Sequence, residues 1–257
     1  MSILKKIVEN TRENLKAKKA KLSLEDVKSS LKELDLPKSN FKSSISNKDE
    51  AIIAEIKKAS PSAGVISENF NPVEKAKEYE SVGAAALSIL TEEDFFLGSI
   101  DYLKAVKRTT SLPILRKDFI IDEYQIYESK LIGADCILLI ASILSDLQIE
   151  EFVKIAKKLE LDYLIEIHDE KELKRVVLYK DALIGVNNRN LKTLKTDLNT
   201  TYDIHNVLLK HQGPLISESG IKTKDELLDL KNKTSIKTFL IGESLLKNLE
   251  NNSIFSV

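Results

Sequence analysis

The spacing of apolar and polar positions changes at residue 51, and this change predicts where the sheet begins. Residues 51–56 are apolar and rich in isoleucine apart from Glu55, a pattern typical of a strand buried on both faces of a parallel sheet. Seven further apolar runs of similar length follow along the chain. The eight predicted strands are residues 51–57, 84–90, 112–117, 134–141, 162–167, 182–187, 214–218 and 236–242.

Segments with helical spacing fill the gaps between these strands. Pro72 and Ser145 favour helix starts, and Gly83 and Gly133 favour helix ends just before a strand. Eight strand–helix units predict an α/β fold, a single (β/α)8 TIM barrel, because an open doubly wound sheet gives no reason for eight evenly spaced repeats. The predicted helices are residues 72–82, 99–108, 123–132, 145–160, 170–179, 199–210, 223–230 and 243–249.

Two amphipathic helices are predicted ahead of the first strand. The first carries apolar residues at helical spacing and then a basic run. In the second, Ser23 and Asp26 resemble a capping box, and Pro37 is expected to end the helix. The pattern therefore predicts an N-terminal helical extension at 1–46 and the barrel at 47–257, one domain overall, and leaves open which end of the barrel the extension covers. Its expected buried residues are Ile3, Leu4, Ile7, Val8, Leu15, Val27, Leu31 and Leu34.

Composition narrows the class of partner. The chain has 257 residues and nearly balanced charge, with 39 Lys and Arg against 40 Asp and Glu, which argues against a nucleic-acid binder that uses bulk electrostatics. No apolar run is long enough to span a bilayer and no signal peptide is evident, so we expect a cytoplasmic protein without membrane contact. The single cysteine, Cys136, lies in an apolar run and is expected to be a buried thiol.

Polar residues that interrupt the apolar strands share one position, the carboxyl end of a strand. They are Glu55, Lys57, Lys117, Glu166, Asn187, Arg189 and Glu218. Active sites of (β/α)8 barrels are built on that rim, so solvation alone does not account for five strands that end this way. Lysines beside carboxylates can serve as general acid and general base on one substrate.

The last two strands carry a second feature. Glycines at 220 and 242 follow them directly, and the second opens into a short helix. Glycine lets backbone N–H groups approach an anion, and the loops after strands seven and eight are the usual phosphate site of this fold, so we expect a phosphorylated small-molecule substrate. Aromatic residues that could line a slot for a flat ring follow strands two and three: Phe95, Phe96 and Phe119.

Metal and nucleotide chemistry are not predicted. His168, His205 and His211 lack the spacing of metal ligands, and no dinucleotide or P-loop fingerprint is present, so we expect no metal and no cofactor. His168 follows Glu166 by two residues, but we interpret it as a solvent-exposed loop histidine.

The motifs resemble those of the indole-3-glycerol phosphate synthase family, the lyases of tryptophan biosynthesis. The resemblance covers almost the whole chain, and its most specific motifs, in order, are EIKKASPS, LRKDFI and NNRNL. It implies ring closure of 1-(2-carboxyphenylamino)-1-deoxyribulose 5-phosphate, with loss of CO2 and water. By the same resemblance Lys117 is the general acid and Lys57 holds the anionic groups of the substrate. Glu55 and Glu166 are alternative candidates for the base and for stabilising cationic intermediates.

The resemblance assigns the remaining positions by motif. Asn187 and Glu218 complete the catalytic set. The residues implied in substrate binding are Ser60, Phe95, Phe119, Arg189 and Ser219, and those implied in phosphate binding are Lys57, Ser219, Gly220, Gly242 and Glu243. We expect a monomer with at most weak association with other tryptophan-pathway enzymes. Two alternatives stay open, another phosphate-binding barrel enzyme such as a phosphoribosyl isomerase, and a catalytically inactive phosphosugar-binding barrel.

Overall fold

Parallel pairing of the buried strands closes the sheet into a barrel. The computed structural model describes residues 2–66, 69–191, 193–208, 211 and 213–247. Within these ranges eight strands pair in the cyclic order β1-β10-β9-β8-β7-β6-β5-β4, and β4 returns to β1. The strands are β1 Ala51–Ile56, β4 Ala86–Leu90, β5 Ile114–Lys117, β6 Cys136–Ile140, β7 Asp162–Ile167, β8 Leu183–Asn187, β9 Leu215–Glu218 and β10 Thr238–Ile241.

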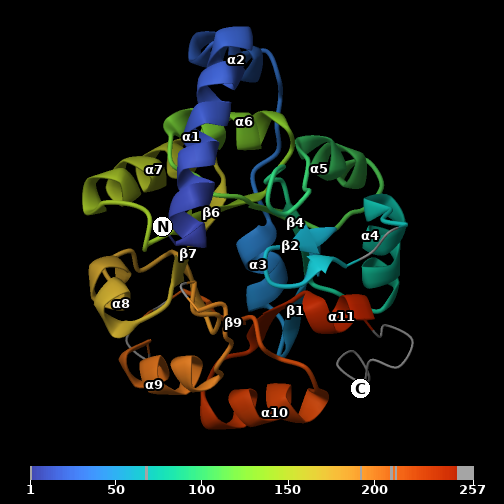
Figure 1. Ribbon diagram of the computed structural model, residues 1–257, viewed down its shortest axis with the longest axis vertical. Coiled ribbons are helices and arrows are strands. Elements are labelled where there is room, and N and C mark those ends of the chain that lie inside the picture. The colour runs from blue at the N-terminus through green and yellow to red at the C-terminus, as the bar shows by residue number, and fades with distance from the viewer. Residues whose placement is uncertain (1, 67–68, 192, 209–210, 212, 248–257) are drawn as a thin grey trace.

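Helices connect successive strands and cover the outside of the barrel, where they form a ring in Figure 1. They are α4 Pro72–Ser81, α5 Ile100–Lys107, α6 Glu123–Leu131, α7 Asp146–Lys158, α8 Glu170–Val176, α9 Asn199–Leu208, α10 Lys224–Lys233 and α11 Glu243–Lys247. Local sequence sets several of their starts. Pro72 stands in the first turn of α4, and Ser145 and Thr223 form capping boxes at α7 and α10.

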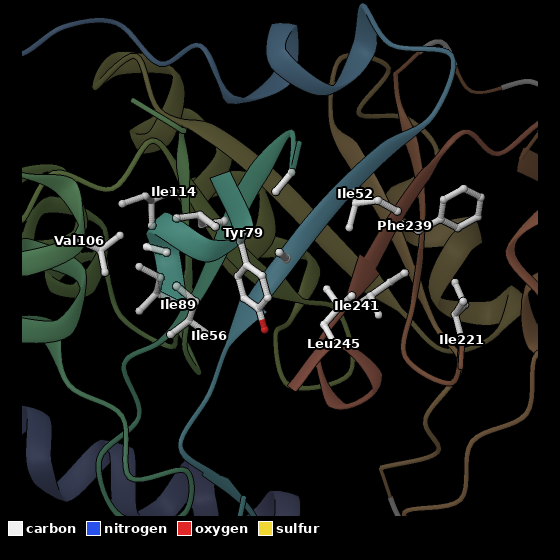
Figure 2. Close-up of a cluster of buried hydrophobic side chains, with 14 of the residues drawn as sticks. Ile52, Ile56, Tyr79, Ile89, Val106, Ile114, Ile221, Phe239, Ile241 and Leu245 are labelled. Carbon is white, nitrogen blue, oxygen red and sulfur yellow. The ribbon is translucent and has the colours of Figure 1, made fainter. Parts of the chain in front are cut away.

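Alternation along each strand separates two apolar layers. Outward-facing side chains of the strands, such as Ile52 and Phe239 in Figure 2, pack against side chains of the surrounding helices, such as Tyr79 of α4, and all three are at most 5% exposed. Inward-facing side chains, among them Ile53 and Leu115, fill the barrel interior and are fully buried. Because both faces are covered, the strands contain continuous apolar runs instead of alternating ones.

The sequence predicted all eight strands and the eight helices that follow them, with most ends shifted by one to three residues. The predicted helix ends at residues 210 and 249 lie outside the described residues. Three short elements were not predicted: helix α3 (Phe41–Ser46) and the small antiparallel ribbon β2 (Ala59–Ser60) with β3 (Gly64–Val65) in the loop after β1. None of the helices in the described part of the chain has the length and apolar character needed to cross a bilayer.

The N-terminal extension reaches both ends of the barrel. Helix α1 (Ile3–Lys21) begins inside the ring of helices in Figure 1 and runs outward to the rim, where α2 (Leu24–Lys32) lies. Helix α3 lies at the opposite end, where its Phe41 and Ile45 are buried against the first residues of the strands. Asp162, the first residue of β7, accepts hydrogen bonds from the Ser39 hydroxyl and the Lys42 amide.

Two details of the predicted extension were wrong. The second helix was expected to continue to Pro37, but α2 ends at Lys32, with Glu33 as its C-cap. Leu34 was expected on the buried face and is 47% exposed, because it lies beyond the end of that helix. The capping box at Ser23 and Asp26 is confirmed.

Helix α1 is held by polar contacts to the loop after β4 and to the N-cap residue of α6. Asp94 in that loop accepts hydrogen bonds from the side-chain amides of Asn10 and Asn14, and Lys19 forms an ion pair with Asp122 at 2.7 Å. Ile7 and Leu15 on the same helix are buried. Polar anchors on one side and apolar packing on the other therefore hold α1 across the barrel.

The burial of Phe41 predicts that the extension is part of the folding unit. We expect Phe41→Ala to lower the free energy of unfolding by about 3 to 5 kcal/mol, because it removes a large ring from a closed apolar site. Leu34→Ala is the matched control and should change stability by less than about 0.5 kcal/mol. Urea denaturation followed by circular dichroism measures both variants. Equal, small changes in the two would contradict a structural role for α3.

Candidate active site

A cavity of about 790 Å³ opens at the carboxyl ends of the barrel strands. The loops after β1, β8, β9 and β10 and the first residues of α1 contribute to its wall. The sequence-predicted residues that line it are Glu55, Lys57, Ser60, Phe96, Lys117, Phe119, Glu166, Asn187, Arg189, Ser219, Gly220, Gly242 and Glu243. Parallel strands bring their carboxyl ends to one edge, so residues as distant in sequence as 55 and 243 share this cavity.

Lys117 occupies the floor of the cavity between two carboxylates. Its ammonium group donates to Glu166 Oε2 at 2.8 Å and to Glu218 Oε2 at 2.7 Å. The side chains of Glu166 and Glu218 are 3% and 1% exposed, so the two carboxylates are almost completely removed from water. Glu218 does not line the cavity itself and acts from beneath Lys117.

Burial and neighbouring charges shift the pKa values of these three groups in different directions. Burial by itself would lower the pKa of Lys117, but the two adjacent carboxylates outweigh it and raise that pKa. Burial favours the neutral form of Glu166, yet Lys117 and His168 hold its pKa below the usual range. Burial raises the pKa of Glu218 to about 7; Lys117 opposes this rise and Glu166 adds to it. One carboxylate is therefore held ionised while the other can take up a proton near neutral pH.

A second ion pair lies at the end of β1. Lys57 donates to Glu55 Oε1 at 2.5 Å, and both side chains are mostly buried. The pKa of Glu55 is lowered, because Lys57 and Lys117 together outweigh the effect of burial. Unlike Glu218, both members of this pair line the cavity, so substrate groups can reach them.

Arg189 joins three parts of the cavity wall. Its guanidinium donates to the Ser62 hydroxyl at 3.1 Å and to the Leu194 carbonyl at 3.3 Å, and it pairs with Glu243 at 3.4 Å. The Arg189 amide donates to the side chain of Asn187, the last residue of β8. Loops after β1, β8 and β10 are thus connected through one side chain.

Two glycines provide the space that the carboxylates occupy. A Cβ atom at Gly185 would lie 1.9 Å from Glu218 Oε1, and one at Gly242 would lie 2.5 Å from Glu55 Oε1. Gly185 lies within β8, next to the strand that carries Glu218, and Gly242 directly follows β10, next to the strand that carries Glu55. Gly242 was expected as a phosphate-binding residue, and the structure shows that its lack of a side chain leaves room for Glu55. Gly185 was not predicted, because a glycine within an apolar strand carries no chemical signal of its own.

The backbone after β9 is shaped for an anion. Ser219 and Gly220 follow one another with positive φ angles of 65° and 88°, in the left-handed region. The Ser219 N–H donates to the Leu240 carbonyl, so Gly220 is the residue of this turn whose N–H is left to face a concavity, a common way of binding phosphate. Lys222 and Thr223 also line this part of the cavity and were not predicted, because they lie beyond the short motif that marked the loop.

The opposite part of the cavity is apolar. Phe119 and Phe96 line it with ring centroids 6.0 Å apart, and Ile3, Leu4 and Ile7 of α1 complete it. Both Phe95 and Phe96 were expected at this wall, and the family resemblance assigned substrate binding to Phe95, but only Phe96 of the two lines the cavity. Two adjacent phenylalanines in a loop cannot be told apart by pattern alone.

Glu92 fixes the loop that carries these phenylalanines. Its carboxylate accepts the backbone N–H groups of Phe95 at 2.7 Å and Phe96 at 2.9 Å. Glu92 is 5% exposed, and burial raises its pKa despite these hydrogen bonds. A buried carboxylate that orders a binding loop was not predicted, because its role depends on backbone geometry.

His168 differs from its sequence-based interpretation. It was expected to be exposed in a loop, but its side chain is 14% exposed and lies between Glu166 and Glu172. Among the described residues there is no cluster of three or more histidine, cysteine, aspartate or glutamate side chains placed to hold a metal ion. Cys136 is buried, as expected, and burial raises the pKa of its thiol.

The fold and the cavity define a (β/α)8-barrel enzyme with paired acid–base groups at its carboxyl-terminal end. Sequence comparison is specific: a family model described as indole-3-glycerol phosphate synthase matches residues 4–256. The indole-3-glycerol phosphate synthase of Clostridium acetobutylicum is 46% identical over 96% of this chain and 94% of its own. That of Acinetobacter baylyi is 47% identical over 96% of this chain and 91% of its own.

The chain therefore belongs to the indole-3-glycerol phosphate synthase family. Its activity is that of this carboxy-lyase of tryptophan biosynthesis, and its substrate is a phosphorylated small molecule. Family membership therefore decides against the two alternatives that the sequence left open, another phosphate-binding barrel enzyme and a catalytically inactive phosphosugar-binding barrel. Among solved structures, a mutant tryptophan synthase alpha-subunit from Pyrococcus furiosus has a TM-score of 0.61 at 16% identity, covering 78% of this chain and 90% of that one, a likeness of fold alone.

Gly185 has no room for a side chain, because Glu218 occupies the space beside it. We expect Gly185→Ala to lower kcat about a hundredfold, because the added methyl group displaces Glu218 from Lys117, and misplacement by about 1 Å can have an effect of that size. Steady-state kinetics on Gly185→Ala, Glu218→Gln and the double variant measure the effect. The two losses should be far from additive, because both act on one contact. Fully additive losses would show that Gly185 acts elsewhere.

Proposed function

We propose that Lys117 is the general acid of the synthase reaction and that Glu166 and Glu218 hold it in place. The observation that supports this is the position of its ammonium group, bound to two buried carboxylates on the cavity floor. The proposed substrate is 1-(2-carboxyphenylamino)-1-deoxyribulose 5-phosphate, whose aromatic ring suits the apolar wall at Phe96 and Phe119. Its phosphate suits the loop at Ser219 and Gly220 at the other side.

Ring closure forms a bond between the aromatic carbon that bears the carboxylate and the ketone carbon of the sugar chain. The ketone oxygen takes a proton from Lys117 and becomes a hydroxyl group. A developing alkoxide is a far stronger base than an amine, so this transfer is favourable even from a lysine whose pKa is raised. The bond to the carboxylate carbon then breaks, CO2 leaves, and the electron pair restores the aromatic ring.

Positive charge develops on the nitrogen as the ring closes, and the ionised Glu166 stabilises it. In the dehydration step the new hydroxyl group leaves as water with one proton, and the neighbouring methylene carbon loses another proton to a base. The Glu55–Lys57 pair contains one acid and one base and faces the cavity, so we assign this step to it. Asn187 orients Arg189 through the backbone and keeps the loop after β8 in register.

The phosphate is held by the loops after β9 and β10, at Ser219, Gly220, Gly242 and Glu243, where Ser219 offers its hydroxyl because its N–H donates to the Leu240 carbonyl. Lys57, Ser60 and Arg189 lie around the same cavity and supply positive charge and a hydroxyl donor. No cofactor is needed in this scheme, because each step moves protons and breaks bonds within the substrate.

The role of Lys117 is tested by Lys117→Ala. We expect kcat to fall by about 10² to 10⁴, the usual contribution of general acid catalysis, while a substrate analogue binds within about tenfold of the parent. Lys58→Ala is the matched control, since Lys58 lies next to the same rim but does not line the cavity. Indole fluorescence measures turnover. A Lys117→Ala variant with the parent kcat would disprove the assignment.

The phosphate site is tested by comparing two glycines with similar backbone angles. Gly220 has φ +88° and lies in the cavity, while Gly83 has φ +90°, and a Cβ atom added there would have no neighbour within 4 Å. Gly220→Ala should raise KM for the phosphorylated substrate about tenfold and weaken competition by inorganic phosphate, because it distorts the loop and crowds Leu198. Gly83→Ala introduces the same backbone strain at a distance. Equal kinetic effects of both changes would place the phosphate elsewhere.

A further inference from the structure

His168 stands at the end of β7 and is fixed by the start of α8. Asp169 caps that helix by accepting the Glu172 amide at 2.8 Å, which turns Glu172 back toward the strand end. The Glu172 carboxylate then accepts the His168 backbone N–H at 2.8 Å and faces its Nδ1 at 3.2 Å. One carboxylate therefore holds both the backbone and the ring of His168, and the ring has little freedom to rotate.

The other ring nitrogen faces the active site. His168 Nε2 lies 3.3 Å from Glu166 Oε1, while Glu166 Oε2 accepts from Lys117 at 2.8 Å. Each oxygen of Glu166 thus has its own positively charged or proton-bearing neighbour. Without His168, one oxygen of this nearly buried carboxylate would lose its counter-charge and the group could turn away from Lys117.

Because both ring nitrogens face carboxylates, both carry a proton in the favoured state of the imidazole. Burial by itself would lower the pKa of His168, but its contacts with Glu166 and Glu172 raise it to about 10. The charged groups that bear on the ring are Glu166 of β7 and Glu172 of α8, with Lys117 of β5 on the far side of Glu166. The nearby cation of α8, Arg175, is bound to Asp146 and to backbone carbonyls.

We propose that His168 is a positioning residue for the synthase reaction: its ring, held by Glu172, fixes Glu166 so that this carboxylate keeps Lys117 aimed into the cavity. The inference rests on the proposed roles of Lys117 and Glu166 and adds a chain of three contacts from α8 to the general acid. His168 acts through Glu166, since it does not itself line the cavity.

The test is His168→Asn, which removes the charge and shortens the side chain. We expect kcat to fall between about tenfold and a hundredfold, with KM within about threefold of the parent, because substrate contacts are retained and only the alignment of Lys117 is lost. The ratio of parent to variant kcat should also grow as pH falls from 8 to 5.5. An imidazolium beside Glu166 lowers the pKa of that carboxylate, so its loss lets Glu166 take up a proton at higher pH.

His205→Asn is the matched control, because His205 lies on α9 and does not line the cavity. It should behave like the parent at every pH. Glu172→Gln is the second variant, which leaves the histidine in place and removes its anchoring charge; we expect the same pH trend with a smaller loss of kcat. If His168→Asn does not fold, as judged by circular dichroism, Glu172→Gln decides the question.

A kcat within twofold of the parent across this pH range, in His168→Asn or in the deciding Glu172→Gln, would overturn the inference. Lys117→Ala is measured in parallel. If Lys117→Ala loses turnover while His168→Asn is unaffected, only the role of His168 is rejected. If Lys117→Ala keeps full turnover, the proposed general acid itself is rejected.

Discussion

The site depends on one buried ammonium group shared by two buried carboxylates. Removing three charged groups from water is unfavourable unless they are closely paired, and the pairing requires that strands β5, β7 and β9 end at the same height in the barrel. Lys117 is the last residue of β5 and Glu218 is the last of β9, so closure of the barrel brings these two strand ends together. The chemistry is therefore a consequence of how the barrel closes, and Gly185 supplies the space that this closure needs.

Adjacent residues of β5 have different surroundings, because successive side chains of a strand point to opposite faces. Lys117 faces the cavity, whereas Arg116 faces the surrounding helices and is 1% exposed. Arg116 binds the carboxylates of Asp118 and Glu128, and Asp118 accepts the backbone N–H of Phe119. A buried ionic network behind the strand thus supports both Lys117, the proposed general acid, and the aromatic wall in front of it.

The barrel and most of the site could be predicted from the sequence, because apolar runs define the strands and carboxyl-terminal strand ends meet at one edge. What could not be predicted depends on three-dimensional proximity. His168 is buried only because Asp169 turns Glu172 back onto it, and Gly185 matters only because Glu218 comes from the next strand. Helix α3 has six residues and no periodic pattern of its own, so only its packing beneath the barrel reveals it.

The position of α1 has a practical consequence for handling the protein. Ile3 and Leu4, at the start of α1, belong to the wall of the cavity. A purification tag, fluorophore or fusion partner attached ahead of Ser2 would therefore be joined to the chain next to residues of that wall. Labels are better attached to an exposed helix remote from the cavity, for example near Lys154 on α7, whose side chain is 72% exposed.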